Sequence, residues 1–421
     1  MFEGLIAAIK NADLRKKILF TVMILLLYRL GALIPVPFVD TAFLGTIFNN
    51  SGLTDMLNIM SGGALQNAAL FAMGISPYIN ASIIVQLLTI AIPALERLKN
   101  QEDGQKKINK ITRYLTIALG LVMGYGYYTI LDNAMGVLTQ KTFFTGLVVV
   151  LAFTAGSALV MWMAEKIDEY GIGNGISMIL FAGILSQGPA ILAWVVDAFK
   201  SGDAAGIAGV FIVLAIGLLM IAGIVWVNGA ERRIPVQYAK RVVGRKMYGG
   251  NQTHLPMKVL MTGVMPIIFA NSFCMLPSTI ASFMSKNGFT EWVEKYFTTD
   301  SPLYGILFFV LIIFFNYFYV SVSYDPVEIS NNLQKNGGSI PGIRPGEPTV
   351  NYIKKSLNKI TLLGAIFLGF IAIIPMIATM IFDVNFALSG NSMLIVVSII
   401  LETSMVLESQ ISMRHYKGFL E

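Results

Sequence analysis

The side chains that could carry out catalysis or bind a metal are few in this 421-residue sequence and lie far apart. The one cysteine, Cys274, lies inside an apolar block, and the two histidines, His254 and His415, lie in separate polar segments. No phosphate-binding loop of the G-x-x-x-x-G-K-S/T type is found, and no His–Asp or carboxylate pairing typical of catalysis stands out. The sequence therefore predicts no enzyme, no metal site and no cofactor, with Cys274 as a small core residue.

Isolated charges and glycine-rich stretches inside the apolar blocks do not form a recognisable site. Arg29 and Glu402 are the charged residues well inside these blocks, whereas ion-coupled pumps usually bury several acidic groups at mid-membrane. We expect Arg29 to extend its guanidinium outward, and Glu402 could face a polar cavity or a partner helix. Residues 171–175 lack the spacing of a dinucleotide-binding loop, and residues 124–126 lack the flanking pore loop of a potassium filter.

Long apolar blocks make up most of the chain, which is 55% hydrophobic and 13% charged. A spanning helix needs about 20 mostly apolar residues, and blocks of that length without alternation form helices rather than barrel strands. The blocks fall at 18–36, 71–92, 114–131, 147–164, 175–193, 207–228, 259–280, 303–322, 360–381 and 392–410. We therefore predict an all-α membrane protein with ten transmembrane helices.

Basic residues predict which side of the membrane the loops occupy. Ten spans put both termini on one side, and that side carries nearly all the Lys and Arg of the loops, for example Lys16, Arg97, Lys106, Lys240 and Lys354. The opposite side carries only Lys141, Lys200, Lys286 and Lys295. Because cytoplasmic loops are rich in Lys and Arg, both termini should be cytoplasmic. The first block is too long for a signal peptide and precedes Pro35-Val36-Pro37, so it is predicted to be an anchor.

Two cytoplasmic loops are larger than transport of a small solute requires. Residues 229–258 interleave apolar and basic side chains and contain a Gly-Gly break at 249–250, which indicates a short hairpin or an extended arm. Residues 323–358 contain Gly337-Gly338 and the run Pro341 to Gly346, a density of Gly and Pro that favours a shaped turn over a helix. Loops of this kind are suited to docking a large partner.

A short motif recurs in the second and the seventh block. Gly74, Pro77, Ile79 and Ala81 match Gly263, Pro266, Ile268 and Ala270 in register, and a small polar residue follows each alanine. The second block runs inward and the seventh outward, so the repeat predicts two inverted halves, residues 1–200 with spans 1–5 and residues 201–421 with spans 6–10. Internal prolines weaken or kink a helix, and the matched pair predicts two kinked helices at a mobile centre.

Several longer segments resemble the SecY family, and the resemblance extends over essentially the whole chain. The matching segments are Tyr28 to Gly31, Ile34 to Pro37, Ser61 to Leu65, Pro77 to Ile84, Gly171 to Ser177, Gln237 to Arg241 and Pro341 to Gly346. The resemblance implies a protein-conducting channel with an hourglass pore between the two halves, which opens sideways between spans 2–3 and 7–8. It also implies a bacterial plasma-membrane location.

The resemblance assigns roles inside the channel. Its apolar pore ring carries over to Ile75, Ile79, Ile176, Leu180, Ile268 and Ile395, with leucine at 180 in place of the usual isoleucine. Its plug carries over to residues 61–70, which begin Ser61, Gly62, Gly63, Ala64, Leu65, Gln66 and Asn67. By composition alone, this stretch is an external loop or a helix of two turns. An apolar ring can close a pore to water and ions while accepting chains of any sequence.

The resemblance also implies partners. The two large loops would bind the motor SecA or a translating ribosome through Arg232, Arg233, Lys240, Arg241, Arg245, Lys246 and Arg344. Further partners would be SecE, SecG, signal peptides, nascent or unfolded polypeptides, and the membrane lipid into which apolar segments leave.

A polar cluster and two alternatives complete the hypothesis. Ser82, Gln86 and Asn271 could hold the lateral gate shut by hydrogen bonds, or they could serve as ordinary helix-packing contacts. A secondary transporter with inverted repeats is the leading alternative, although mid-membrane ion-binding charges are scarce. A membrane-embedded enzyme is the second, and the scarcity of catalytic groups argues against it.

Overall fold

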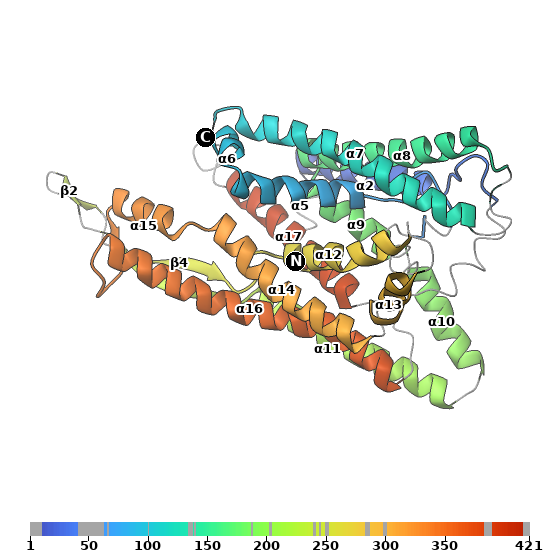
Figure 1. Cartoon of the computed structure of the whole chain (residues 1–421). Helices are drawn as coiled ribbons and strands as arrows, with labels where there is room; N and C mark the ends of the chain where they lie inside the picture. Colours follow the sequence, from blue (N-terminus) through green and yellow to red (C-terminus); the bar gives the residue numbers. More distant parts are fainter. Residues whose placement is uncertain are drawn as a thin grey trace. The chain divides into compact units, whose positions relative to one another are not determined.

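The computed structural model is predominantly helical (Figure 1). It describes residues 11–40, 63–64, 67–99, 101–133, 138, 140–186, 188–201, 204–238, 241–243, 246–248, 252–282, 287–297, 301–382 and 390–415. The helices are α2 (Ala12–Gly31), α5 (Ser76–Ala91), α6 (Pro93–Lys99), α7 (Gly104–Asn133), α8 (Phe143–Tyr170), α9 (Gly175–Leu185), α10 (Gly188–Ser201), α11 (Ala204–Asn228), α12 (Met265–Ser282), α13 (Gly288–Tyr296), α14 (Pro302–Ser323), α15 (Pro326–Lys335), α16 (Glu347–Phe382) and α17 (Gly390–His415). The strands are β1 (Glu231–Tyr238), β2 (Arg241–Val243), β3 (Lys246–Tyr248), β4 (Gln252–Lys258) and β5 (Gly338–Ser339).

Each of the ten apolar blocks is largely helical, as predicted. The fifth block, expected to be one helix over 175–193, is two helices instead, because α9 ends at Leu185 and α10 begins at Gly188. Among the described residues, five helices are long and apolar enough to cross a membrane. The number rises to six if α5 and α6, which bend by 107° at their junction, form one span. The chain is thus a multi-pass helical membrane protein, and the count of ten spans stays a prediction.

The chain forms two compact units. Unit 1 comprises residues 1–210, 275–301 and 399–421, and unit 2 comprises residues 211–274 and 302–398. Three of the four boundaries between the units fall inside α11, α12 and α17, and the fourth lies at the start of α14.

Unit 1 is built around α5, α7 and α8, which pack against one another, while α2 and α9 pack against α8. Its core includes Met73, Tyr127, Val149 and Phe153, all at most 8% exposed.

Cys274, in the part of α12 that belongs to unit 2, is 1% exposed, which confirms its prediction as a buried core residue. The Gly124–Gly126 stretch is an ordinary part of α7.

Most described residues of segment 61–70 are buried or partly buried in unit 1, whereas Asn67 is exposed. Ala69 forms an isolated bridge with Pro35, and its N–H donates to the carbonyl of Ala64 at 2.8 Å. Ala64 is fully buried in a cluster with Ala32 and Ala69. Residues 63–64 and 67–70 are turns and a bridge, so the two-turn helix that composition allows is absent there. Ser61, Gly62, Leu65 and Gln66 lie outside the described residues.

The repeated motif marks two helix starts, and the prediction of two proline kinks is wrong. Pro77 and Pro266 lie in the first turns of α5 and α12, where a proline removes no helical hydrogen bond. The matched glycines produce the turn instead, since Gly74 has φ +53° and Gly263 has φ +58°. A left-handed backbone of this kind favours glycine. In both units, therefore, a left-handed glycine precedes the helix and a proline three residues later lies in its first turn.

Unit 2 combines a pair of long helices with a small sheet. α14 packs against α16, and α15 packs against the start of α16. β1 pairs antiparallel with β4 from Glu231↔Lys258 to Gln237↔Gln252, and β5 pairs with the other edge of β1. β2 and β3 form a separate antiparallel hairpin. The hairpin predicted within 229–258 is therefore confirmed.

Candidate functional site

The two large loops, predicted as separate features, form one folded body in unit 2. We call it the loop body: β1, β4, β5, α15 and the N-terminal part of α16. Its core alternates along β1, where Ile234 and Val236 are buried and their neighbours Arg233 and Pro235 are exposed. The cluster also includes Leu333 of α15 and Ile353 of α16. Sequence patterns showed each loop but not the contact between them, because β1 and β5 are about a hundred residues apart in the chain.

The turn between α15 and α16 has a defined backbone. Gly337, Gly342 and Gly346 have φ of +71°, +80° and +99°, which favours glycine at these positions. The hydroxyl of Thr349 donates to the carbonyl of Arg344 at 2.9 Å. Residues 336–346 are thus the shaped turn predicted from the Gly and Pro content. The flanking parts of loop 323–358 are helical. On one side lies α15, whose start is capped by the Asp325 side chain, which accepts from the N–H of Val327 at 2.8 Å. On the other side α16 begins at Glu347.

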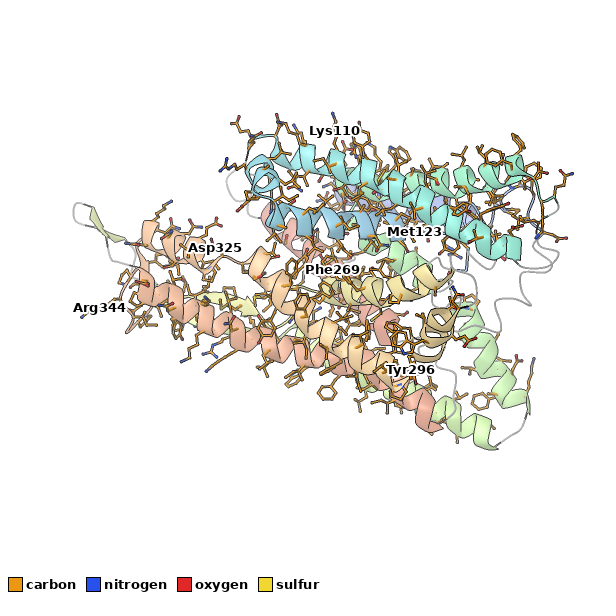
Figure 2. All side chains as sticks on the ribbon, viewed as in Figure 1. Lys110, Met123, Phe269, Tyr296, Asp325 and Arg344 are labelled. Atoms are coloured by element: carbon orange, nitrogen blue, oxygen red, sulfur yellow. The ribbon has the colours of Figure 1, made fainter. Side chains whose placement is uncertain are left out.

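Basic residues on the loop body are exposed. Figure 2 shows Arg344 at the turn before α16 and Asp325 at the start of α15. Arg232 and Arg233 lie exposed on β1, and the Nε of Arg233 donates to Glu231 Oε1 at 2.7 Å in a solvent-exposed ion pair. Exposed pairs of this kind contribute little stability, so the guanidinium groups stay available to a partner.

Of the remaining basic residues predicted for docking, Arg241 begins β2 and Lys246 begins β3. Arg241 pairs with Tyr248 and Val243 pairs with Lys246 in the register of the β2–β3 hairpin. Lys240 and Arg245 lie outside the described residues.

The residues predicted for the pore ring are mostly buried in their own units. In unit 1, Ile75, Ile79 and Leu180 are at most 5% exposed, and Ile176 is partly buried. Ile75 caps α5 rather than lying inside it, and its carbonyl accepts from Ile79 N at 3.1 Å. In unit 2, Ile268 is 5% exposed and Ile395 is partly buried.

The predicted gate residues divide between the two units. Gln86 Nε2 donates to Ser82 Oγ at 3.3 Å within α5, so these two form the pair that their i,i+4 spacing allows. Asn271 is buried on α12 of unit 2, at 7% exposure.

A buried polar network beside the start of α12 was not anticipated. The hydroxyl of Thr262 donates to Asn316 Oδ1 at 2.7 Å, and Asn316 Nδ2 donates to the carbonyl of Thr361 at 2.9 Å. All three residues are at most 7% exposed. The sequence feature that could have indicated this network is Asn316, because a single amide side chain inside an apolar span usually forms hydrogen bonds to a neighbouring helix. The network joins the α12 start to α14 and α16.

A second group of polar contacts, also unanticipated, holds the start of α9. Thr21 of α2 accepts from the N–H of Ile172, and Asp168 of α8 accepts from the N–H of Gly175. Asn174 caps α9 by accepting from the N–H of Ser177 at 3.2 Å. The sequence shows residues 171–175 as a glycine-rich stretch without dinucleotide spacing and as part of the SecY-like segment Gly171 to Ser177, but it does not reveal the contacts with Thr21 and Asp168.

The fold and these sites define a multi-pass α-helical membrane protein whose folded basic body is built from two connections, one between α11 and α12 and one between α14 and α16. Comparison with known proteins then identifies the family. The SecY family profile matches residues 69–404. The protein translocase subunit SecY of Streptomyces galbus is 44% identical, and that of Corynebacterium glutamicum 42%, each over the full length of both chains. The chain belongs to the SecY family.

Solved structures agree with the fold. A structure of a protein-conducting channel superposes with a TM-score of 0.64 at 18% identity, covering 94% of this chain and 92% of the other. Sec61 in the canine ribosome–channel complex gives a TM-score of 0.60 at 18% identity, covering 94% and 92%.

Proposed function

We propose that this chain is the pore subunit of a protein-conducting channel. It passes unfolded secretory polypeptides across the bacterial plasma membrane and releases apolar segments sideways into lipid. The observation that carries the proposal is membership of the SecY family over the full chain length, with relatives named as protein translocase subunits. The chain does no covalent chemistry in this role, so it is not an enzyme.

The constriction of this pore is formed by the six ring residues, Ile75, Ile79, Ile176, Leu180, Ile268 and Ile395. All six are aliphatic, so a narrow passage between them expels water and ions, and a polypeptide of any sequence can displace them. The paired helix starts at Gly74 and Gly263 support the proposal, because each places a ring isoleucine five residues further on.

Segment 61–70 is the plug, and the gate opens between the two halves. The small residues Ala64, Ala68 and Ala69 pack closely inside unit 1, which suits a segment that fits into a confined space. Ser82, Gln86 and Asn271 hold the gate by hydrogen bonds that are each worth about 0.6 kcal/mol in a membrane, weak enough to break during each release.

The loop body is the docking face for SecA or a translating ribosome. Exposed arginines on a rigid turn and strand suit bidentate contacts to carboxylates and phosphates. Ribosomal RNA is a polyanion, so basic side chains supply much of the attraction. The loop body is therefore cytoplasmic, as are both termini, and SecE and SecG complete the membrane complex.

Photo-crosslinking of a stalled secretory chain tests the proposed path. A photoreactive residue at Ile79, which is 5% exposed, should crosslink to the stalled chain. The same residue at Ile90 of α5, which is 48% exposed, should crosslink to lipid instead. Equal crosslinking of the polypeptide at both positions, or none at Ile79, would show that the path does not run along the ring.

A charge reversal tests the docking face. Arg344→Glu should abolish motor-driven export while the protein remains folded in the membrane, because the turn backbone depends on its glycines and not on this side chain. Lys110→Glu, at an exposed position on α7 outside the loop body, serves as the matched control and should export like the parent. If both variants export like the parent, the turn is not part of the docking face.

A further inference from the structure

The loop between α8 and α9 is held by side chains from two different helices. Thr21 of α2 lies 5% exposed, and its Oγ1 accepts from the N–H of Ile172 at 3.0 Å. The same hydroxyl donates to the carbonyl of Lys17 at 3.0 Å, which fixes its orientation. Asp168, in the last turn of α8, accepts from the N–H of Gly175 at 2.7 Å through Oδ1. The backbone is therefore held at both ends of a short loop.

The glycines of this loop bring it against its neighbours. A Cβ on Gly171 would come within 2.6 Å of Thr21 Oγ1, and a Cβ on Gly175 would overlap the carbonyl oxygen of Ala164. Gly173 has φ +80°, a conformation that side chains disfavour. Close approach and a left-handed turn leave the start of α9 little freedom to shift.

The start of α9 carries two residues of the proposed ring. Ile176 is the residue after Gly175, and Leu180 follows one turn later on the same face. A displacement of the loop would therefore move both ring side chains together. Thr21 and Asp168 contribute nothing to the ring surface themselves, so they would act on it only through the backbone.

We propose that Thr21 and Asp168 are positioning residues that set the closed pore ring by anchoring the start of α9. The inference rests on the proposed channel function and extends it. When either anchor is lost, α9 can shift and the apolar ring closes less completely. The closed channel then rejects weak substrates less strictly, so a secretory protein with a defective signal segment passes more often.

Export of a reporter with a crippled signal segment, at matched amounts of channel, tests the anchor. Thr21→Val removes the acceptor while keeping the shape, and we expect it to raise export about fivefold, the effect of one net hydrogen bond. Asp168→Ala should act in the same direction but less strongly, because Asp168 is exposed. Thr21→Ser and Asp168→Asn keep an acceptor and should return export to the parent value.

Two matched controls separate the anchor from general destabilisation. Thr116 is a buried threonine of α7 whose hydroxyl donates within its own helix to Thr112, so Thr116→Val should leave export unchanged. Glu169, next to Asp168 and paired with Lys166, should tolerate alanine equally well. If Thr21→Val and Thr116→Val behave alike, or if the conservative variants fail to restore the parent value, the proposal is wrong.

A second readout measures the ring without using transport. Ile176→Cys, in a Cys274→Ala background, offers one thiol whose rate of modification by a maleimide reports how open this part of α9 is. Thr21→Val should raise that rate and Thr21→Ser should not. An unchanged rate overturns the anchor, and a raised rate without increased export overturns its link to the ring. Failure of the parent to export a reporter with an intact signal would instead count against the proposed function.

Discussion

The two helix starts of the repeat share a backbone but are stabilised differently. In unit 1, Gly74 N donates to Phe71 O and Ile79 N donates to Ile75 O. In unit 2, Gly263 N donates to Leu260 O and Ile268 N donates to Val264 O. These bonds match at a constant offset of 189 residues, since 263 − 74 and 268 − 79 both equal 189. Both units therefore contain the same glycine turn with the same backbone hydrogen bonds.

The residue before the glycine differs between the two starts. In unit 1 it is Met73, 2% exposed, packed in an apolar cluster that includes Phe153. In unit 2 it is Thr262, whose hydroxyl joins the Asn316 network. Apolar packing is non-directional, whereas the network fixes donors against acceptors. The comparison indicates that one backbone turn can be anchored by packing or by hydrogen bonds, with different tolerance to mutation.

The largest effect is expected in the apolar anchor. Met73→Ala should lower the free energy of unfolding by about 3 kcal/mol, because truncation of a buried methionine leaves a cavity as well as losing apolar burial. Met23→Ala, at a position 48% exposed on α2, is the matched control and should cost far less. Thermal unfolding in detergent measures both. Equal losses at Met73 and Met23 would contradict packing as the anchor of unit 1.

A smaller effect is expected in the polar anchor. Asn316→Leu removes both side-chain bonds and should cost about 1–2 kcal/mol of unfolding free energy. Adding Thr262→Val to this variant should cost little more, since the partner of Thr262 is already gone. Thr361→Val is the control, because Asn316 bonds to the backbone carbonyl of Thr361 and not to its hydroxyl. Additive losses for Asn316→Leu and Thr262→Val would argue against a single network.

Hydropathy and glycine placement gave the helical blocks, the hairpin and the turn at 336–346. These features depend on local composition, so a single sequence carries them. The contact between the two large loops and the Thr262–Asn316–Thr361 network depend on residues 45 or more positions apart, which local patterns do not reveal. The roles of the ring, plug and gate came from resemblance to the SecY family. The prediction of proline kinks is wrong because Pro77 and Pro266 lie in the first turns of their helices, and the repeat alone does not show where a helix begins.

The shared backbone predicts equal effects at the two glycines. Gly74→Ala and Gly263→Ala should each cost about 1 kcal/mol of unfolding free energy, from forcing an alanine into the left-handed region. Around Gly263 no atom lies within 4 Å of an added Cβ, so strain alone should act there. Asparagine tolerates this region better, and Gly263→Asn should lose less than Gly263→Ala. Alanine without cost at Gly263 would contradict the repeated turn.

The smallest effect concerns the polar positions that follow the two starts, Ser82 in unit 1 and Asn271 in unit 2. Gln86→Met keeps the length of the side chain but removes the donor to Ser82. A membrane hydrogen bond is worth about 0.6 kcal/mol, so the open fraction of idle channels should rise about threefold. Gln105→Met is the matched control, since Gln105 makes the same i,i+4 type of bond to Asn109.

Single-channel conductance in planar bilayers measures the open fraction. If the gate depends on Ser82, Gln86 and Asn271 together, then Gln86→Met and Asn271→Ala should not be additive, because each variant already breaks the shared set of bonds. Additive effects would mean that the Ser82–Gln86 pair only stabilises its own helix. Asn271 would then belong, like Thr262, to the internal packing of unit 2. The two helix starts would therefore differ in their side-chain contacts not only before the glycine but also at Ser82 of α5 and Asn271 of α12.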